Sequence, residues 1–137
     1  MHELQASKDS LPTSLILIKC SNCDNQMSSE PTVLAHLKLT AIPSLPLACF
    51  IESVVVWKKL RGQGIGKYLM GKAEEYCKYN LQLTELYLAT TDKEDFYAKL
   101  GYTPCEPVSI FGGPCNLPFR PVTKKKYMKK VLVENFV

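Results

Sequence analysis

The sequence contains no apolar run that approaches the roughly 20 residues a transmembrane helix requires. Residues 1–5 have neither the positively charged segment nor the apolar segment of a secretory signal. Internal repeats, heptads and low-complexity tracts are also absent. We therefore exclude coiled-coil and repeat architectures, and we expect a cytoplasmic protein with no membrane partner.

Metal-binding patterns are sparse. Cys20 and Cys23 form one C-x-x-C pair, but a structural zinc site needs a second Cys or His pair at similar spacing. The other cysteines occur singly, as Cys49, Cys77, Cys105 and Cys115. We predict no metal site, and we expect all six cysteines to be reduced thiols, their usual state in the cytoplasm.

The sequence also lacks a large net charge. The net charge is only +4, although basic residues gather in segments 58–67 and 124–130. Runs of lysine are usually solvated faces of a protein. No series of stacking aromatic residues interleaves with these clusters, as a groove for single-stranded nucleic acid would require. We therefore expect no nucleic-acid partner.

What the sequence does contain is a globular composition. Its 137 residues, of which 46% are hydrophobic, are enough for a single domain over residues 1–137 with its own core. Residue periodicity predicts strands and helices in alternation. The predicted strands are 11–19, 32–42, 48–57, 84–90, 103–111 and 127–133, and the predicted helices are 64–80 and 92–100.

Several residues should mark the ends of these elements. Pro43 and Pro46 are expected to end the second strand, because proline cannot donate to a strand ladder. Asp92 is expected to cap the N-terminus of the shorter helix, and Gly101 to terminate it.

Segment 54–70 carries the strongest indication of function. It begins with three valines expected in a buried strand, passes through a basic turn with Gly62, Gly64 and Gly66, and continues as an amphipathic helix. A glycine-rich helix N-terminus binds anions, because free N–H groups and the positive end of the helix dipole point at one spot. Glycine also allows the backbone to approach a phosphate closely. The segment therefore predicts a phosphate-binding site.

Two common phosphate-binding loops do not fit this spacing. A P-loop needs four residues between its first glycine and the Gly-Lys pair, whereas Gly62 and Gly66 are separated by three, and Tyr68 stands where Ser or Thr is required. The dinucleotide pattern G-x-G-x-x-G would place its last glycine at Lys67 or at Leu69. Both alternatives fail.

What remains is the pattern Arg61-x-x-Gly64-x-Gly66 between a strand and a helix, followed by a second strand and the run Phe96-Tyr97-x-x-x-Gly101-Tyr102. This arrangement resembles the GNAT superfamily of N-acetyltransferases, whose acetyl-CoA signature is Q/R-x-x-G-x-G/A. The resemblance implies an α/β (α+β) GNAT fold, with a central mixed, mostly antiparallel sheet, a splayed pair of parallel strands and flanking helices.

The resemblance also implies acetyl-CoA as co-substrate and no metal. The strand end would hold the pantetheine arm and the thioester oxygen, while the loop amides and nearby lysines would hold the phosphates. Thr90 stands where the family usually has an asparagine that contacts the cofactor. The implied cofactor-binding residues are Val54, Val55, Val56, Arg61, Gly62, Gln63, Gly64, Ile65, Gly66, Lys67 and Thr90.

Two residues are candidate catalysts. Tyr97 matches the family tyrosine that protonates the departing thiolate as a general acid, and its alternative role is a core aromatic beside Phe96. Glu52 would act as a general base through a water, or would form a strand-edge salt bridge. An α-amine titrates near ~7.8 and lysine near ~10.4, so an α-amine is roughly 3.5 kcal/mol easier to deprotonate. The lack of an obvious buried base is compatible with an α-amine acceptor.

Further motifs are similar to those of the GNAT branch that acetylates the processed N-terminus of actin. They are Glu52-Ser53-Val54-Val55-Val56, Leu60-Arg61-Gly62, Thr90-Thr91-Asp92, and Phe96-Tyr97 followed by Glu106-Pro107-Val108. The resemblance implies an N-α-acetyltransferase for an acidic N-terminus, with Lys38 and Thr91 as acceptor-binding residues. It also implies actin, alone or in complex with profilin, as the partner of a monomeric enzyme.

Two alternatives stay open. One is a lysine or small-amine acetyltransferase of the same superfamily. The other is a non-catalytic domain that binds acetyl-CoA or actin. This second alternative arises because the first strand and two helices of the family pattern would precede residue 1, so an N-terminally truncated domain is expected.

Overall fold

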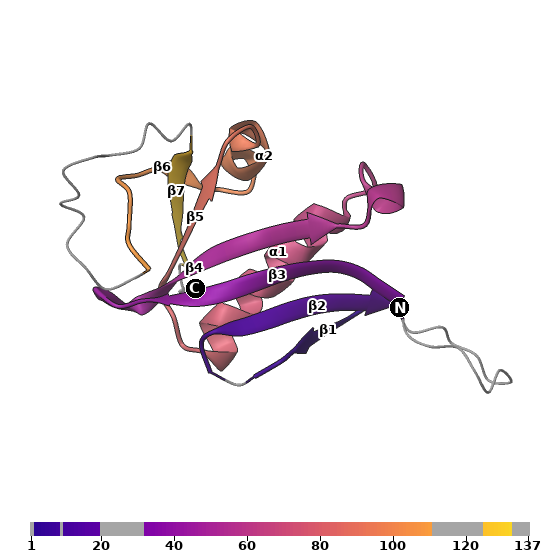
Figure 1. Ribbon diagram of the computed structural model, residues 1–137, viewed down its shortest axis with the longest axis horizontal. Helices are drawn as coiled ribbons and strands as arrows, with labels where there is room; N and C mark the ends of the chain where they lie inside the picture. Colours follow the sequence, from indigo (N-terminus) through magenta and orange to yellow (C-terminus); the bar gives the residue numbers. More distant parts are fainter. Residues whose placement is uncertain (1, 9, 20–31, 111–124, 133–137) are drawn as a thin grey trace, which may run out of the picture.

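The computed structural model describes residues 2–8, 10–19, 32–110 and 125–132. They form one seven-stranded sheet with the order β1-β2-β3-β4-β5-β7-β6 (Figure 1). All neighbouring strands are antiparallel except β4 and β5, which are parallel. The strands are β1 (His2–Ala6), β2 (Thr13–Lys19), β3 (Thr32–Ile42), β4 (Leu45–Val56), β5 (Glu85–Thr90), β6 (Thr103–Pro104) and β7 (Lys126–Val131). This mixed sheet confirms the expected fold class.

The helical segments lie between β4 and β5 and after β5. A 3-10 turn, η1 (Lys58–Leu60), leads to α1 (Ile65–Glu75), which continues as a π-helical turn, η2 (Tyr76–Asn80). The second helix, α2 (Glu94–Lys99), is shorter than the range 92–100 expected from the sequence. The helix predicted for 64–80 is therefore confirmed in extent, but it contains two geometries.

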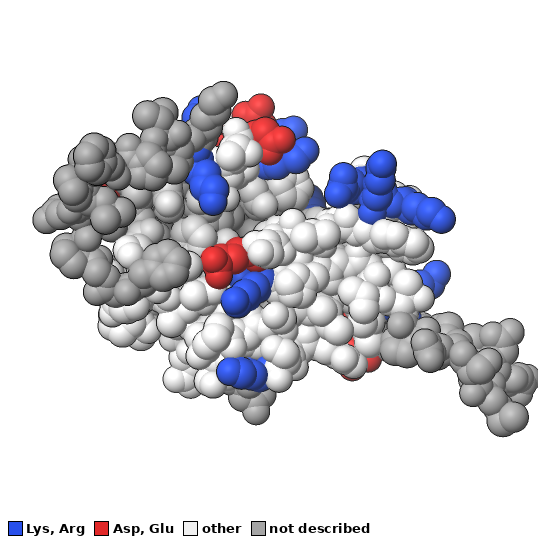
Figure 2. All heavy atoms as spheres, in the orientation of Figure 1, with Lys and Arg blue, Asp and Glu red and all other residues white. Residues whose placement is uncertain are grey.

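The main core lies between one face of the sheet and α1, which passes behind β3 and β4 in Figure 1. Leu69, Met70 and Ala73 of α1 are completely buried there. A smaller cluster around Ala48 and Tyr87 lies on the opposite face, because consecutive strand residues point to opposite sides. Figure 2 views this opposite face, which has few charged side chains over β2 to β4.

The strands differ from the sequence predictions in several places. β1 was not expected, because its residues show no β-branched run and its pairing with β2 is non-local. Pro46 lies inside β4 rather than before it. The β3–β4 register is irregular between Ala41 and Ile42, where a proline without an N–H is tolerated. β6 covers only Thr103–Pro104 of the range expected to be a strand.

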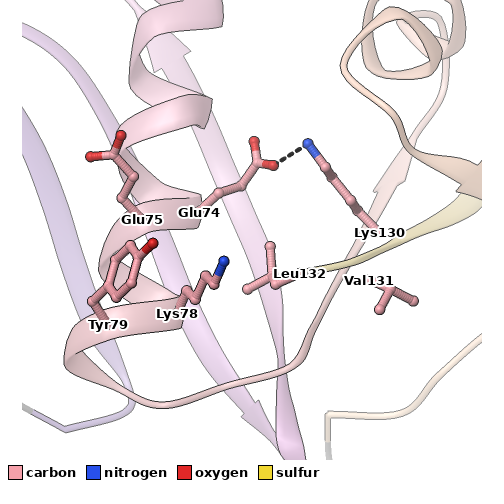
Figure 3. Close-up of a pocket in the computed structure, with 7 residues that line it drawn as sticks. All are labelled: Glu74, Glu75, Lys78, Tyr79, Lys130, Val131 and Leu132. Atoms are coloured by element: carbon pink, nitrogen blue, oxygen red, sulfur yellow. Dashed lines mark ion pairs between the residues drawn. The ribbon is translucent and has the colours of Figure 1, made fainter. Parts of the chain in front are cut away.

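Glu74 of α1 and Lys130 of β7 form a partly buried ion pair (Figure 3). The Lys130 Nζ also donates a hydrogen bond to the Leu100 carbonyl at 2.7 Å, and it lies 5.8 Å from the centre of the Tyr102 ring. These contacts join α1, β7 and the segment that follows α2.

Candidate active site

Strands β4 and β5 pair only near the start of β5 and then separate, as Figure 1 shows. Their parallel pairing runs from Ala48 and Glu85 to Ile51 and Leu88. Beyond this point the end of β4 pairs with β3 alone. The edge of β4 that faces the gap therefore carries backbone groups with no partner strand, which are available to a ligand. The expected splayed parallel pair is thus present.

A β-bulge at Ser53 lies where the two strands separate. Lys38 pairs with Glu52 and His36 with Val55, so β4 has one more residue than β3 in this interval. Ser53 has a positive φ of 56°, which is uncommon for a residue other than glycine. The bulge shifts the side-chain alternation of β4 by one residue from this point onward.

This shift decides which valines face the core. Ile51 lies in the main core before the bulge, and Val54 and Val56 pack against the same core after it. Val55 is 52% exposed on the other side. The prediction that all three valines are buried is therefore wrong, since only two of them contact the core and neither is fully covered.

The glycine loop holds its backbone open for a ligand. Gly62 and Gly64 have φ values of 85° and 79°, and Gly64 occupies the N-cap position of α1. Within the described chain, the amides of residues 62–67 donate to no backbone carbonyl, and the Tyr68 amide is the first to donate back, to Gly64 O at 3.0 Å. A Cβ built on Gly62 or Gly64 would meet no atom within 4 Å. This arrangement suits an anion at the positive end of the helix dipole.

Basic side chains surround this loop. Figure 2 shows a compact group of blue atoms over η1 with no red atoms beside it in that view. Lys58, Lys59, Arg61 and Lys67 are all exposed. The Arg61 Nε donates to the Val56 carbonyl at 3.3 Å, so this guanidinium already contacts the open edge of β4.

A first pocket of about 590 Å³ joins the edge of β4 to the glycine loop and to α2. Of the predicted cofactor-binding residues, Gln63 and Thr90 do not line it, and the others do. Its lining residues are Val54, Val55, Val56, Leu60, Arg61, Gly62, Gly64, Ile65, Gly66, Lys67, Lys93, Phe96 and Tyr97.

A second pocket of about 360 Å³ lies in the gap between β4 and β5. It shares Val54, Lys93 and Tyr97 with the first pocket, so the two pockets meet at Tyr97. The predicted residues Thr90 and Thr91 line this second pocket. Its other lining residues are Ile51, Ser53, Leu88, Ala89, Asp92 and Lys125.

Tyr97 occupies the junction of the two pockets. It is only 8% exposed, and its ring contacts Phe96 and Tyr102 edge-on, with centroid distances of 5.0 and 5.9 Å. Burial, together with the negative charge of Asp92, raises the pKa of the Tyr97 hydroxyl above its ordinary value. The hydroxyl is therefore protonated at neutral pH, as a proton donor must be.

The start of α2 is held by a threonine rather than by the expected aspartate. The Thr90 Oγ1 accepts a hydrogen bond from the Lys93 amide at 3.0 Å, and Lys93 is the N-cap residue. The prediction that Asp92 caps this helix is therefore wrong. Asp92 is instead one of the residues that line the second pocket. Asp92 and Lys93 were not predicted as site residues from the sequence, because their proximity to the gap depends on where α2 lies. The lysines near the C-terminus, among them Lys125, were expected behind Lys38 in an acceptor groove, and Lys125 lines the second pocket.

Two predicted residues lie outside both pockets. Glu52 accepts a hydrogen bond from the Thr40 hydroxyl, and it pairs across the strands with Lys38. Neither Glu52 nor Lys38 lines the two pockets around Tyr97. The Cys20–Cys23 pair lies outside the described residues.

The described residues contain neither a metal-binding cluster nor a membrane-spanning helix. No group of three or more His, Cys, Asp or Glu residues comes together there as a metal site would require. Among the described helices, none is long and apolar enough to cross a membrane.

A family model described as an acetyltransferase (GNAT) domain matches residues 32–104, which is more than half of the chain. This range contains β3, β4, the glycine loop, α1, β5 and α2. The chain belongs to the GNAT acetyltransferase family. It therefore has the expected superfamily.

A curated relative of this GNAT domain is also an acetyltransferase by name. The domain is 34% identical to mouse N-alpha-acetyltransferase 80 over 108 residues, which are 79% of this chain and 33% of the relative. The chain thus spans about a third of the length of that relative.

Solved structures share the fold of this GNAT domain. The spermidine/spermine N-acetyltransferase SpeG from Vibrio cholerae matches with a TM-score of 0.61 and 14% identity, over 90% of this chain and 67% of that one. N-acetylglutamate synthase from Neisseria gonorrhoeae, in complex with coenzyme A and N-acetyl-glutamate, matches with a TM-score of 0.60 and 12% identity, over 88% of this chain and 26% of that one.

Proposed function

We propose that this GNAT domain transfers the acetyl group of acetyl-CoA to the free α-amine of an acidic N-terminal peptide, such as the processed N-terminus of actin. The observation that carries the proposal is the meeting of two pockets at Tyr97, one built for a phosphate-bearing donor and one open to an acceptor. The identity to mouse N-alpha-acetyltransferase 80 supports an α-amine as the acceptor.

The first pocket fits acetyl-CoA in three respects. Its glycine loop presents free amides and basic side chains to a pyrophosphate. The open edge of β4 at Val54 and Val56 offers N–H and C=O groups to the amides of a pantetheine arm. The half-buried valines supply an apolar wall for its methylenes. In the complex with coenzyme A, N-acetylglutamate synthase shares this fold, which also supports the proposal.

Acetyl-CoA would supply an acetyl group activated as a thioester. In the proposed reaction, Tyr97 gives its proton to the departing thiolate, and its raised pKa keeps that proton available at neutral pH. The free N–H groups at the end of β4 hold the thioester oxygen, where negative charge develops. Glu52 can assist only through water in this scheme, since it does not line either pocket.

The second pocket suits an acidic acceptor. Lys93 and Lys125 line it and provide positive charge around the place where a peptide would enter. Thr91 lines the same pocket and is proposed to bind the acceptor backbone. Lys38 is exposed and lines neither pocket, so in this proposal it contacts only residues farther from the acceptor amine. Actin, alone or with profilin, and a cytoplasmic setting are the partner and location that we propose.

The second candidate function is acetylation of a polyamine or of lysine. It is favoured by the structural match to SpeG, which is a spermidine/spermine N-acetyltransferase. The second pocket is lined by two lysines and one carboxylate, that of Asp92, and this excess of positive charge argues against a polyamine, which carries several positive charges.

The experiment that tests these functions is a competition between acceptors. The protein is incubated with acetyl-CoA and peptides that begin Asp-Asp-Asp, Glu-Glu-Glu or Ala-Ala-Ala, with an N-blocked peptide that contains lysine, and with spermidine. Mass spectrometry then identifies the acetylated nitrogen. We expect the acidic peptides to be acetylated fastest, at the α-amine. Faster acetylation of spermidine or of the internal lysine would contradict the proposal and support the second candidate.

Thermal unfolding with acetyl-CoA separates both enzymes from a non-catalytic binding domain. A ligand at about a hundred times its Kd stabilises the folded state by roughly 2.7 kcal/mol. Stabilisation of this size without turnover of any acceptor would indicate a domain that binds acetyl-CoA but does not transfer its acetyl group.

A further inference from the structure

The second pocket contains one carboxylate among its lining residues, that of Asp92. Asp92 is exposed, and its carboxylate has no hydrogen-bond or ion-pair partner among the described residues. Lys93 and Lys125 line the same pocket and Tyr97 forms its boundary with the first pocket. Asp92 thus lines the same pocket as two lysines and the proposed proton donor, and its carboxylate, without a partner among the described residues, is available to a ligand.

The neighbouring acidic residues are placed differently. Glu94 forms an ion pair with Lys126, and Glu52 accepts a hydrogen bond from the Thr40 hydroxyl. Asp95 is exposed on α2, and it does not line either pocket around Tyr97. Of these carboxylates, Asp92 alone faces the gap between β4 and β5.

Acetyl transfer to an amine requires such a group. A neutral amine attacks the thioester carbon, and positive charge develops on its nitrogen as the C–N bond forms and the C–S bond breaks. That nitrogen must then lose a proton, while the thiolate must gain one. A nearby carboxylate stabilises the developing charge and can accept the proton.

We propose that Asp92 binds the acceptor amine and accepts its proton, as the counterpart of Tyr97 in the reaction. This inference rests on the proposed function for the transfer itself, but it concerns any amine acceptor. The amine nitrogen passes one proton to Asp92, and Tyr97 passes one to the thiolate. Solvent exchange returns Asp92 to the carboxylate and Tyr97 to the phenol. The net result is one acetylated amine and one free thiol, with no change in the number of protons.

The electrostatic setting agrees with this pairing. The charge of Asp92 contributes to the raised pKa of the Tyr97 hydroxyl, so the two groups are close enough to influence each other. The charged or titratable groups that line the same pocket are Lys93, Lys125 and Tyr97.

The test compares Asp92→Asn with the matched control Asp95→Asn, which lies three positions along and outside both pockets. We expect Asp92→Asn to lower kcat/KM by about 100-fold or more, the usual contribution of acid–base catalysis. The acetyl-CoA Kd, measured by calorimetry, should not change. Asp95→Asn should stay within about 2-fold of the unmodified protein in both measurements.

Two further measurements do not depend on turnover. Without acetyl-CoA, Asp92→Asn should weaken binding of a peptide with a free α-amine by about 10-fold and leave binding of its N-acetylated form unchanged. In addition, the Tyr97 pKa, followed by ¹³C NMR of labelled tyrosine and assigned with Tyr97→Phe, should fall in Asp92→Asn. It should not change in Asp95→Asn.

The outcomes separate this inference from the proposed function. If spermidine is the better acceptor and Asp92→Asn loses that activity, the proposed acceptor is wrong and the role of Asp92 stands. The role is overturned if Asp92→Asn keeps its turnover, or if Glu52→Gln shows the loss instead. If no amine is acetylated at all, the peptide-binding and NMR measurements decide, and unchanged values in both reject the proposal.

Discussion

Ile51 of β4 and Leu88 of β5 are the last residues at which these parallel strands pair. Paired strands lie about 4.8 Å apart, so the gap between β4 and β5 begins at this spacing and widens toward the glycine loop. The bulge at Ser53, two residues after Ile51, turns β4 away from β5.

The positive φ at the bulge leads us to predict how a substitution of Ser53 changes the free energy of unfolding. A residue other than glycine in the left-handed region costs roughly 1–2 kcal/mol, and Ser53 adopts this conformation at φ 56°. Ser53→Gly should therefore raise the free energy of unfolding, by about 1 kcal/mol. The control is Ser14→Gly on β2, where φ is not positive and glycine should lower stability. Urea unfolding measures both changes, and a loss of stability in Ser53→Gly would refute the assignment of strain.

The conformation of the glycine loop leads us to predict that a substitution of Gly64 weakens acetyl-CoA binding. Gly64→Ala meets no atom within 4 Å, but it places a Cβ at φ 79°, where alanine is strained by about 1 kcal/mol or more. We expect lower stability and weaker acetyl-CoA binding, because the loop amides shift. Gly71→Ala is the matched control, since Gly71 lies inside α1 with negative φ and no close neighbour. It should stabilise the protein by about 0.5–1 kcal/mol and leave acetyl-CoA binding unchanged.

Removal of the Tyr97 hydroxyl tests the proton donor. Tyr97→Phe should lower kcat by about 100-fold or more with little change in acetyl-CoA affinity, because the ring and its edge-on contacts remain. Tyr87→Phe is the control, since Tyr87 is also buried but lines neither pocket at Tyr97. An unchanged kcat in Tyr97→Phe would remove the general-acid role.

The buried hydroxyl of Tyr102 leads us to predict how the stability of the protein changes at alkaline pH. Its hydroxyl is buried and has no hydrogen-bond partner in the part of the chain that the structure describes, and burial together with the charge of Glu74 raises its pKa above the ordinary 10.0. A pKa that is higher in the folded state adds stability below the unfolded value, and this stability is lost as pH rises through the folded value. Tyr102→Phe should therefore be neutral or stabilising at pH 7, and its stability should fall less than that of the unmodified protein from about pH 10 upward. Urea unfolding at several pH values checks this, and equal slopes above pH 10 would contradict it.

The local patterns were sufficient to predict most of the framework. The strand of valines, the alternate glycines and the helical periodicity of α1 are encoded in neighbouring residues, and the structure contains these elements. The sequence did not predict the bulge at Ser53, because a positive φ in a strand depends on pairing with β3 rather than on the serine itself. For the same reason the exposure of Val55 was missed.

The site residues also fall into two groups, those that the sequence spacing identifies and those that only the fold brings together. Residues of the glycine loop were identified because their spacing is the signal. Asp92, Lys93 and Lys125 carry no such spacing, and Lys125 is brought to the pocket only by the pairing of β7 with β5. Asp92 was expected to cap α2, but the Thr90 hydroxyl bonds the Lys93 amide there and leaves the Asp92 carboxylate free.

The bond from the Arg61 side chain to the Val56 carbonyl has a consequence for the order of events at the loop. If the proposed coenzyme bound this carbonyl, it would displace the guanidinium, which would then be free to pair with a phosphate at the glycine loop. Arg61 would thus exchange a contact with the strand for a contact with the ligand.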